Sequence, residues 1–288
     1  MRVVWTALVG IAALAAAAAG CRHAEDGDPV GRLGVEPRRV RLDFPGVATL
    51  RLDWTPSKPI DSSRHPRPTV FVHLLDRPHH VLRTFDHELP RAWRPGERIS
   101  YEIELYQSAL GLPLAPGTYM LSAGLYDTVS GFRWPLAADG PDVGRREYRV
   151  ASVEAGGAIP NQPRFLFAGG WRPVPEGESL QAVGRRCLDG NGEVAVRGPH
   201  GAGTMRMLLR GTLAEGSLAS DCAAVELRPD ATGARWADVG IGSEPCHIRF
   251  AGSATSPPAP GPGLCLDVLS WNPEGGAAER VSEPRTKP

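Results

Sequence analysis

Short runs in which every second residue is apolar fill residues 35–155 and predict an all-β fold. In Val40-Arg41-Leu42-Asp43-Phe44 apolar side chains alternate with charged ones, and Ala48 to Trp54 repeats the pattern. A period of two places the apolar set on one face of a strand. Further runs lie at 69–75, 81–85, 99–105, 118–126 and 145–153. About seven strands with almost no helical periodicity predict an antiparallel β-sandwich.

A second β-rich region is predicted over residues 164–271. It opens with Phe165-Leu166-Phe167 and contains a turn at Asp189-Gly190-Asn191-Gly192. Strands are expected at 193–197, 204–210, 223–228, 235–239, 246–251 and 264–271. We expect a second antiparallel sandwich, joined to the first through a linker at 156–163 whose glycines and proline favour a hinge.

The first twenty residues predict a signal peptide. Met1-Arg2 precedes the apolar run Val3 to Ala19, which is shorter than the roughly 20 apolar residues of a typical transmembrane helix. The run ends in Ala18-Ala19-Gly20-Cys21, which resembles the bacterial lipobox, where small residues precede a cysteine that is diacylated and becomes the new N-terminus. The resemblance implies a lipid anchor on Cys21. An ordinary secretory signal and a transmembrane segment are the alternatives.

The lipobox resemblance also implies a compartment. In this class of lipoprotein an Asp after the cysteine is a common signal for retention in the inner membrane, and here the residue is Arg22. We therefore expect a lipid-anchored protein of the cell envelope, in the outer membrane, facing the periplasm or the cell surface. Residues 21–34 are polar and predict a flexible tether. Residues 272–288 are rich in Pro, Glu, Gly and Arg and predict a disordered tail.

Two stretches carry a resemblance to known folds. The segment Leu114 to Tyr119, continuing to Gly124-Leu125-Tyr126-Asp127, resembles the immunoglobulin-like or fibronectin-like domains of bacterial envelope proteins, including those attached to membrane glycosyltransferases. The resemblance implies a fold and transfers no catalytic residue. The second region is similar in outline to jelly-roll domains of the carbohydrate-binding-module type. Comparable domains place a tryptophan after the paired arginines, where this chain has Cys187.

Charge argues against one class of partner. The chain has 32 basic and 32 acidic residues, so its formal net charge is zero. It has no basic stripe interleaved with aromatic residues. A nucleic acid is therefore a poor candidate partner.

Four cysteines remain once Cys21 is set aside, and all lie in the second region. An even number in an exported domain predicts two disulfides, whereas a zinc site is disfavoured because there is no Cys-x-x-Cys pair. Three pairings are open. We favour Cys222 with Cys246, which links neighbours, and Cys187 with Cys265, which joins the early and late strands of the region.

A cluster of imidazole and carboxylate side chains gives a weak candidate for a metal site. The cluster contains His73, Asp76, His79, His80, Asp86 and His87, and the best candidates within it are His73, His80, Asp86 and His87. Zinc, copper and nickel take such ligands. The spacing favours ordinary surface and turn residues, because Pro78-His79-His80 reads as a turn between two strands. We therefore predict no metal and no cofactor.

The sequence contains no motif that commits it to catalysis. It has no Gly-x-Ser-x-Gly, no His-Glu-x-x-His and no phosphate-binding glycine loop. Sugar rings stack on exposed aromatic faces, so Trp171 and Trp236 are hypothetical glycan contacts that require an exposed platform. The alternative is that both tryptophans belong to the core or its rim.

These patterns favour a non-enzymatic envelope lipoprotein that binds a glycan or an envelope protein partner. Two alternatives stay open, namely an accessory subunit of polysaccharide or glycoprotein assembly and an uncharacterised hydrolase. A glycan binder predicts an exposed tryptophan platform. A hydrolase predicts a cleft with paired carboxylates of perturbed pKa.

Overall fold

The computed structural model describes residues 27–173, 184–211, 213, 216–230, 233–251 and 264–274. All regular elements in these residues are strands, so the fold is all-β, as the sequence predicts. The described residues contain no helix long and apolar enough to cross a membrane. The predicted signal peptide and Cys21 lie outside the described residues.

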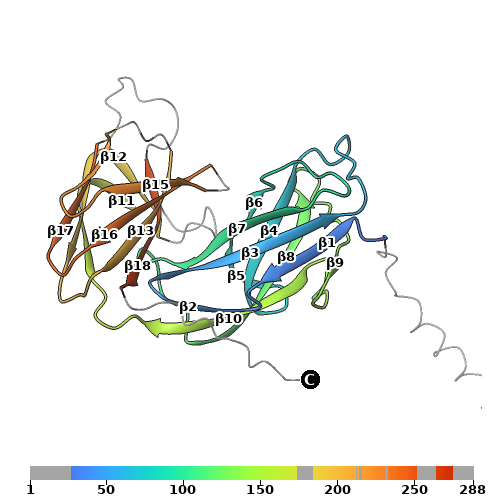
Figure 1. Ribbon diagram of the computed structural model, residues 1–288, viewed down its shortest axis with the longest axis horizontal. Coiled ribbons are helices and arrows are strands. Elements are labelled where there is room, and N and C mark those ends of the chain that lie inside the picture. The colour runs from blue at the N-terminus through green and yellow to red at the C-terminus, as the bar shows by residue number, and fades with distance from the viewer. Residues whose placement is uncertain are drawn as a thin grey trace, which may run out of the picture.

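The first half of the chain forms two sheets (Figure 1). The first sheet has the order β7-β3-β1-β9, and the second has the order β2-β10-β8-β4-β5 with β6 beside β4. Their strands are β1 (Gly31–Glu36), β2 (Arg39–Phe44), β3 (Gly46–Pro56), β4 (Pro68–Arg77), β5 (His80–Thr84), β6 (His87–Glu88), β7 (Ile99–Gln107), β8 (Gly117–Asp127), β9 (Ala137–Ala138) and β10 (Tyr148–Ala158).

One apolar core fills the space between these two sheets. Leu50 and Leu52 enter it from β3, and Val72 and Leu121 enter it from β4 and β8. All four side chains are buried. In β3, Arg51 lies between Leu50 and Leu52 and points outward, so polar and apolar residues alternate there. The alternation read from the sequence therefore places the core correctly, and the two sheets pack face to face as a sandwich.

Two strand pairs are parallel, which the sequence analysis did not anticipate. β2 runs parallel to β10, and β1 runs parallel to the short β9. The cause is a change of sheet, because only Pro37 and Arg38 separate β1 of the first sheet from β2 of the second. The predicted tether at 21–34 extends too far, since residues 31–34 belong to β1. They pair with β3 and alternate between more buried and more exposed positions.

The second half of the chain forms a third sheet with the order β14-β17-β12-β18-β13-β16-β15, and β11 pairs with β12. Its strands are β11 (Arg164–Pro173), β12 (Arg186–Arg197), β13 (Gly203–Arg210), β14 (Leu218–Ser220), β15 (Val225–Pro229), β16 (Arg235–Ile241), β17 (Cys246–Phe250) and β18 (Cys265–Pro273). A second core, which includes Val194, Met207, Ile248 and Trp271, gathers on one face of this sheet.

The predicted turn at 189–192 is wrong, because these residues lie within β12. Before them β12 pairs with β18 at Arg186 and Cys187, and from Gly192, the last of the four, to Val196 it pairs with β17. β11 accompanies β12 along both parts with an irregular register between Gly169 and Trp171. The glycines therefore bend a continuous strand between two partners, where a hairpin turn was expected.

The linker predicted at 156–163 is shorter than expected. β10 continues to Ala158, and the Ile159 amide then donates to the Phe44 carbonyl at 2.7 Å. Only residues 159–163 separate β10 from β11. In Figure 1 the third sheet lies against the end of the first two sheets toward which β10 points.

Candidate functional site

Part of the predicted histidine and carboxylate cluster does form on the outer face of the second sheet. His73 on β4 and Asp86 after β5 approach each other because the hairpin register pairs His73 with Thr84. The His73 Nε2 atom lies 3.5 Å from Asp86 Oδ1, and its Nδ1 atom lies 3.1 Å from Glu147 Oε1. The imidazole therefore lies between two carboxylates, of which the sequence analysis identified only Asp86.

The charges in this cluster stabilise one another. Burial alone would lower the pKa of His73, but the hydrogen bonds and charges of Asp86 and Glu147 outweigh it and raise that pKa to about 9. Burial acts against ionisation of Glu147 as well, yet His73, Ser122 and Arg133 lower the pKa of Glu147 to about 2. At neutral pH His73 is therefore protonated and Glu147 is ionised, and the imidazolium lies between the carboxyl groups of Glu147 and Asp86.

Neighbouring side chains satisfy the remaining atoms of the cluster. The Ser122 hydroxyl donates to Glu147 Oε1 at 2.5 Å, and Arg133 lies 3.4 Å from Glu147 Oε2. The Arg133 guanidinium also lies over the Phe71 ring, 4.4 Å from its centroid. The His73 imidazolium bonds Glu147 through Nδ1 and forms an ion pair with Asp86 through Nε2. A protonated imidazole has no lone pair for a metal, so this group is better explained as a buried ion-pair network.

The other two metal candidates point elsewhere. His80 is exposed and pairs with Asp76 at 2.6 Å. His87 is buried, and its ring bonds the Phe85 carbonyl and the Tyr101 hydroxyl. Burial lowers the pKa of His87. The structure therefore does not bring His73, His80, Asp86 and His87 together around one point.

Trp171 does not form a glycan platform. Its side chain is buried in the core of the third sheet, where its ring meets Phe250 edge-on at 5.0 Å and Phe167 at 5.9 Å. Gly192 lies close beneath it, so that a Cβ atom there would come within 2.6 Å of the indole nitrogen. The hypothesis of an exposed platform at Trp171 is wrong, and the residue belongs to the core, which was the alternative.

Trp236 is buried for a different reason, namely the contact between the third sheet and the first. It packs with Leu208, Ala234 and Val268 of the third sheet against Val47 and Tyr106 of the first. We call these six residues the junction cluster. Trp236 is only 3% exposed, so it offers no exposed platform, and it is buried as the alternative reading of both tryptophans expects.

Ion pairs border the junction cluster. Glu104 on β7 lies 3.6 Å from Arg206 and 3.5 Å from Arg228, and both arginines also pair with Asp238. Burial raises the pKa of Glu104, although the two arginines oppose this shift. The two halves of the chain thus meet through a packed apolar centre with a charged border. A single sequence cannot show this contact, because it joins strands that are distant along the chain.

The paired arginines singled out in the sequence have separate roles. Arg185 makes a bidentate ion pair with the buried Asp267, at 2.6 and 3.0 Å. Arg186 stacks over the Phe167 ring, 4.3 Å from its centroid. Both side chains stabilise the third sheet and leave neither guanidinium fully free for a ligand.

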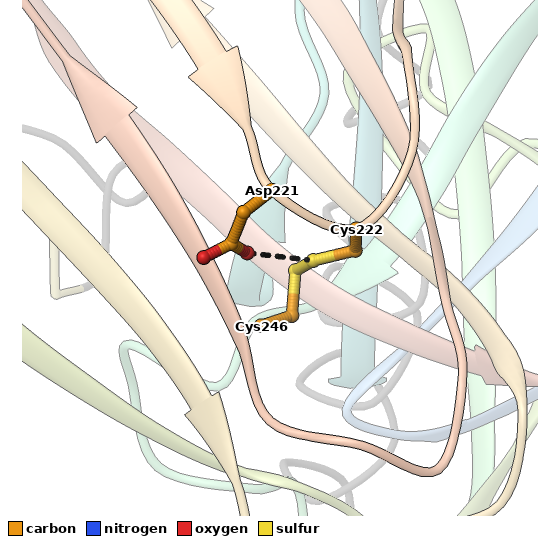
Figure 2. Close-up of side chains that lie close together, drawn as sticks. All are labelled: Asp221, Cys222 and Cys246. Atoms are coloured by element: carbon orange, nitrogen blue, oxygen red, sulfur yellow. Dashed lines mark hydrogen bonds between the residues drawn. A yellow bond between two sulfur atoms is a disulfide. The ribbon is translucent and has the colours of Figure 1, made fainter.

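Both predicted disulfides are confirmed, and so is the favoured pairing. Cys187 on β12 is bonded to Cys265 on β18, and Cys222 after β14 is bonded to Cys246 on β17. Figure 2 shows the second bridge beside Asp221, whose Oδ1 atom lies 3.4 Å from the Cys222 sulfur. Among the described residues these three form the only group with metal-ligand spacing, but both sulfurs are bonded to each other and supply no thiolate.

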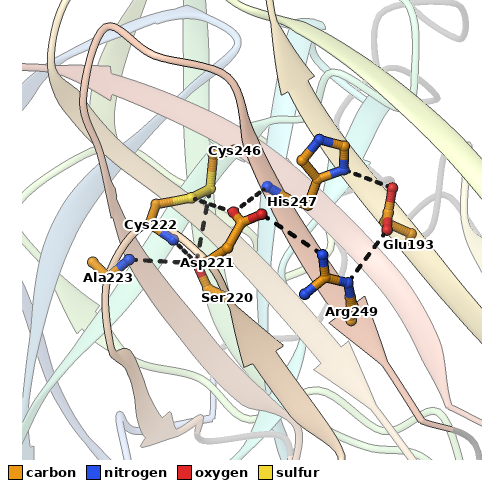
Figure 3. Close-up of a disulfide and its surroundings, with 8 residues drawn as sticks. All are labelled: Glu193, Ser220, Asp221, Cys222, Ala223, Cys246, His247 and Arg249. Atoms are coloured by element: carbon orange, nitrogen blue, oxygen red, sulfur yellow. Dashed lines mark hydrogen bonds and ion pairs between the residues drawn. A yellow bond between two sulfur atoms is a disulfide. The ribbon is translucent and has the colours of Figure 1, made fainter.

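A shallow hollow of about 410 Å³ lies beside this bridge and is lined by Leu218 to Val225. Next to it runs a line of charged side chains from β12, from β17 and from the residue that follows β14, which we call the polar row. Figure 3 shows its members, Asp221, Arg249, Glu193 and His247. Sequence reasoning missed the polar row, because its members come from three separate segments.

Alternating ion pairs hold the polar row together. Arg249 lies 3.7 Å from Asp221 and 3.6 Å from Glu193, and His247 bonds Glu193 at 2.8 Å. The backbone amide of His247 also donates to Asp221 at 2.7 Å. Arg249 nevertheless keeps 60% of its side chain exposed. The polar row is a fixed and accessible set of donors and acceptors.

No model of a known protein family matches this chain, and no curated protein matches it.

Proposed function

We propose that this chain is a non-enzymatic lipoprotein of the cell envelope that binds an envelope protein partner through the polar row and the adjoining hollow. The observation that carries the proposal is their adjacency, since Asp221 belongs to both. An open hollow bordered by charged groups of both signs gives a protein partner a surface with complementary charges. The Cys222–Cys246 bridge holds the two segments that form it.

The compartment is inferred from the cysteines. Disulfides persist in oxidising compartments such as the periplasm and the cell surface. Two disulfides in the third sheet agree with export directed by residues 1–20 and with a lipid on Cys21, which lies outside the described residues. The same proposal includes an immunoglobulin-like fold for the first half of the chain and a jelly-roll fold for the second. It also includes anchoring in the outer membrane.

The chemistry of the polar row favours a protein over a glycan as the partner. Two acidic groups alternate with Arg249 and His247, so the surface complements a partner that carries both signs of charge. Sugar recognition relies on stacking against aromatic rings, and the two tryptophans considered for that role are buried. A partner from polysaccharide or glycoprotein assembly is one protein that this surface would accommodate.

Site-specific photo-crosslinking in cells tests the proposal. A photoreactive residue is placed at Ala219, which is exposed on β14 beside Asp221, and as a control at Ala115, which is exposed between β7 and β8. We expect a protein adduct from position 219 that is absent at position 115 and is lost in an Arg249→Ala, Glu193→Gln variant. Equal adducts at both positions, or a glycan adduct at 219, would overturn the choice of partner.

A further inference from the structure

The end of the sandwich at which the described chain begins differs in charge from the rest of the protein. Three loops meet the N-terminal segment there, and we call residues 27–30, 57–67, 89–98 and 128–136 together the entry end. Backbone hydrogen bonds join them: the Val30 amide donates to Pro135, the Lys58 amide donates to Val30 and the Thr128 amide donates to Arg67. The indole of Trp93 donates to the Lys58 carbonyl at 3.0 Å.

The entry end is basic in a chain that is neutral overall. It contains seven arginine and lysine residues and three acidic residues, whereas the whole chain has equal numbers of each. Arg64, Arg67, Arg91 and Arg94 are all exposed. Within the entry end Lys58, Arg64 and Arg94 pair with its three acidic residues, and Arg98 and Arg133 pair with Asp53 and Glu147 outside it. Among the described residues the guanidinium groups of Arg67 and Arg91 make no ion pair, although the Arg67 backbone amide donates to Asp127.

Apolar side chains project from the same loops. Val129 is 65% exposed and Phe132 is 38% exposed. The Phe132 ring stacks on His65, with centroids 4.3 Å apart, so this apolar tip is fixed directly beside the loop that contains Arg64 and Arg67. Exposed apolar residues surrounded by arginines are typical of surfaces that contact the headgroup region of a bilayer.

The short distance along the chain between Cys21 and the entry end indicates that this surface lies close to a membrane. Six peptide steps separate Cys21 from Gly27, so the described chain begins within roughly 20 Å of that cysteine even if the steps are fully extended. The third sheet contacts the first at Val47 and Tyr106, which are paired at the opposite end of β3 and β7 from the entry end. A lipid on Cys21 thus holds the basic loops near the bilayer and the third sheet away from it.

We infer that the entry end docks onto the surface of a bilayer that contains anionic phospholipid. The inference rests on the proposed anchoring at Cys21. Its arginines contact phosphate groups, and Val129 and Phe132 enter the headgroup region. Docking fixes the orientation of the protein, so that the polar row on the third sheet faces away from the membrane that holds the anchor.

Vesicle sedimentation tests the docking without the lipid anchor. The mature protein is exported with an ordinary cleavable signal and a Cys21→Ser substitution, so that it carries no lipid. We expect it to bind vesicles of phosphatidylethanolamine and phosphatidylglycerol at low salt, to leave them at high salt, and to ignore phosphatidylcholine vesicles. An Arg64→Gln, Arg67→Gln, Arg91→Gln, Arg94→Gln variant should bind at least about tenfold more weakly.

A matched control removes the same charge elsewhere. Arg164, Arg172, Arg197 and Arg235 are exposed in the third sheet, and replacing all four by Gln should leave vesicle binding unchanged. Val129→Ser should weaken binding, whereas Leu166→Ser on β11 should not. Equal losses in variant and control, or no preference for phosphatidylglycerol, would overturn the inference. Failure of the anchor would appear separately, as native protein that carries no lipid.

Discussion

The indole of Trp236 meets the phenol ring of Tyr106 edge-on, with ring centroids 6.2 Å apart, and this contact joins the third sheet to the first. The Tyr106 ring also meets Phe85 of the sandwich core edge-on, with centroids 5.1 Å apart. An edge-to-face arrangement brings the positive edge of one ring to the negative face of the other. The relative position of the two halves of the chain therefore depends on a few well-packed side chains.

The junction should couple the stabilities of the two halves. Trp236→Leu and Tyr106→Leu should each lower the free energy of unfolding. The loss in the double variant should be smaller than the sum of the two single losses, by about 0.5 to 1.5 kcal/mol. Urea unfolding of the four proteins measures this coupling. A coupling energy near zero would mean that the rings do not stabilise each other. The Trp171 and Phe250 pair, within one core, provides a reference cycle.

Stability should depend on the protonation of His73. Its pKa is raised from 6.5 to about 9, so its contribution is complete below pH 6.5 and is lost as the pH rises through about 9. His73→Gln should therefore flatten the decline in the free energy of unfolding over this interval. His80→Gln, at an exposed position paired only with Asp76, is the control and should leave the decline intact. Unfolding in urea at a series of pH values decides between them.

Glu147 should act at the acidic end of the scale. Its pKa is lowered from 4.5 to about 2, so its contribution is present above pH 4.5 and is lost as the pH falls through about 2. Glu147→Gln should be less stable than the native chain at pH 6 and should approach it under acid conditions. A constant difference between the two proteins from pH 2 to pH 6 would contradict this account.

The two disulfides should differ in their effect on stability. Cys187 and Cys265 are 78 residues apart, and Cys222 and Cys246 are 24 residues apart. In the chain-entropy model the longer loop contributes about 4.5 kcal/mol and the shorter about 3.5 kcal/mol. Paired Cys→Ser variants of each bridge, unfolded by urea without reductant, should follow this order. The reverse order would indicate that local packing around Cys222 outweighs loop entropy.

The proposed lipid on Cys21 leads to a labelling experiment. Cys21→Ala should abolish incorporation of radioactive palmitate and release the protein from the membrane fraction. Arg22→Asp is the matched variant, because it keeps the cysteine and should retain the lipidated protein in the inner membrane. Palmitate incorporation by Cys21→Ala would place the lipid elsewhere.

Strand positions were predictable wherever one face of a strand is buried. In β3 the alternation of Leu50, Arg51 and Leu52 reproduces the pattern of burial, because the period of a strand decides which side chains reach the core. The disulfide pairing was also predictable, since the favoured choice joined neighbours and closed the ends of the region. Both predictions rest on local patterns or on simple counting.

What the sequence could not show depends on contacts between distant segments. Glu147 completes the His73 cluster from a loop far along the chain, and nothing in its neighbours marks it. The sequence around Trp236 does not show that another sheet covers this residue, and in the structure the first sheet does so. The glycines at 190 and 192 resemble a turn, and only the change of partner along β12 shows that they bend a strand.

The parallel pairing of β2 with β10 decides how the protein responds to mechanical load. If the protein is anchored and bound as proposed, the membrane would pull on the chain before β1, and a bound partner would pull on the third sheet, which follows the C-terminal end of β10. The two forces act along parallel strands in opposite directions, so the hydrogen bonds between them must shear together instead of opening one at a time. Single-molecule pulling between Asp28 and Arg164 should therefore require a higher force than pulling across the β4–β5 hairpin, which peels open from one end.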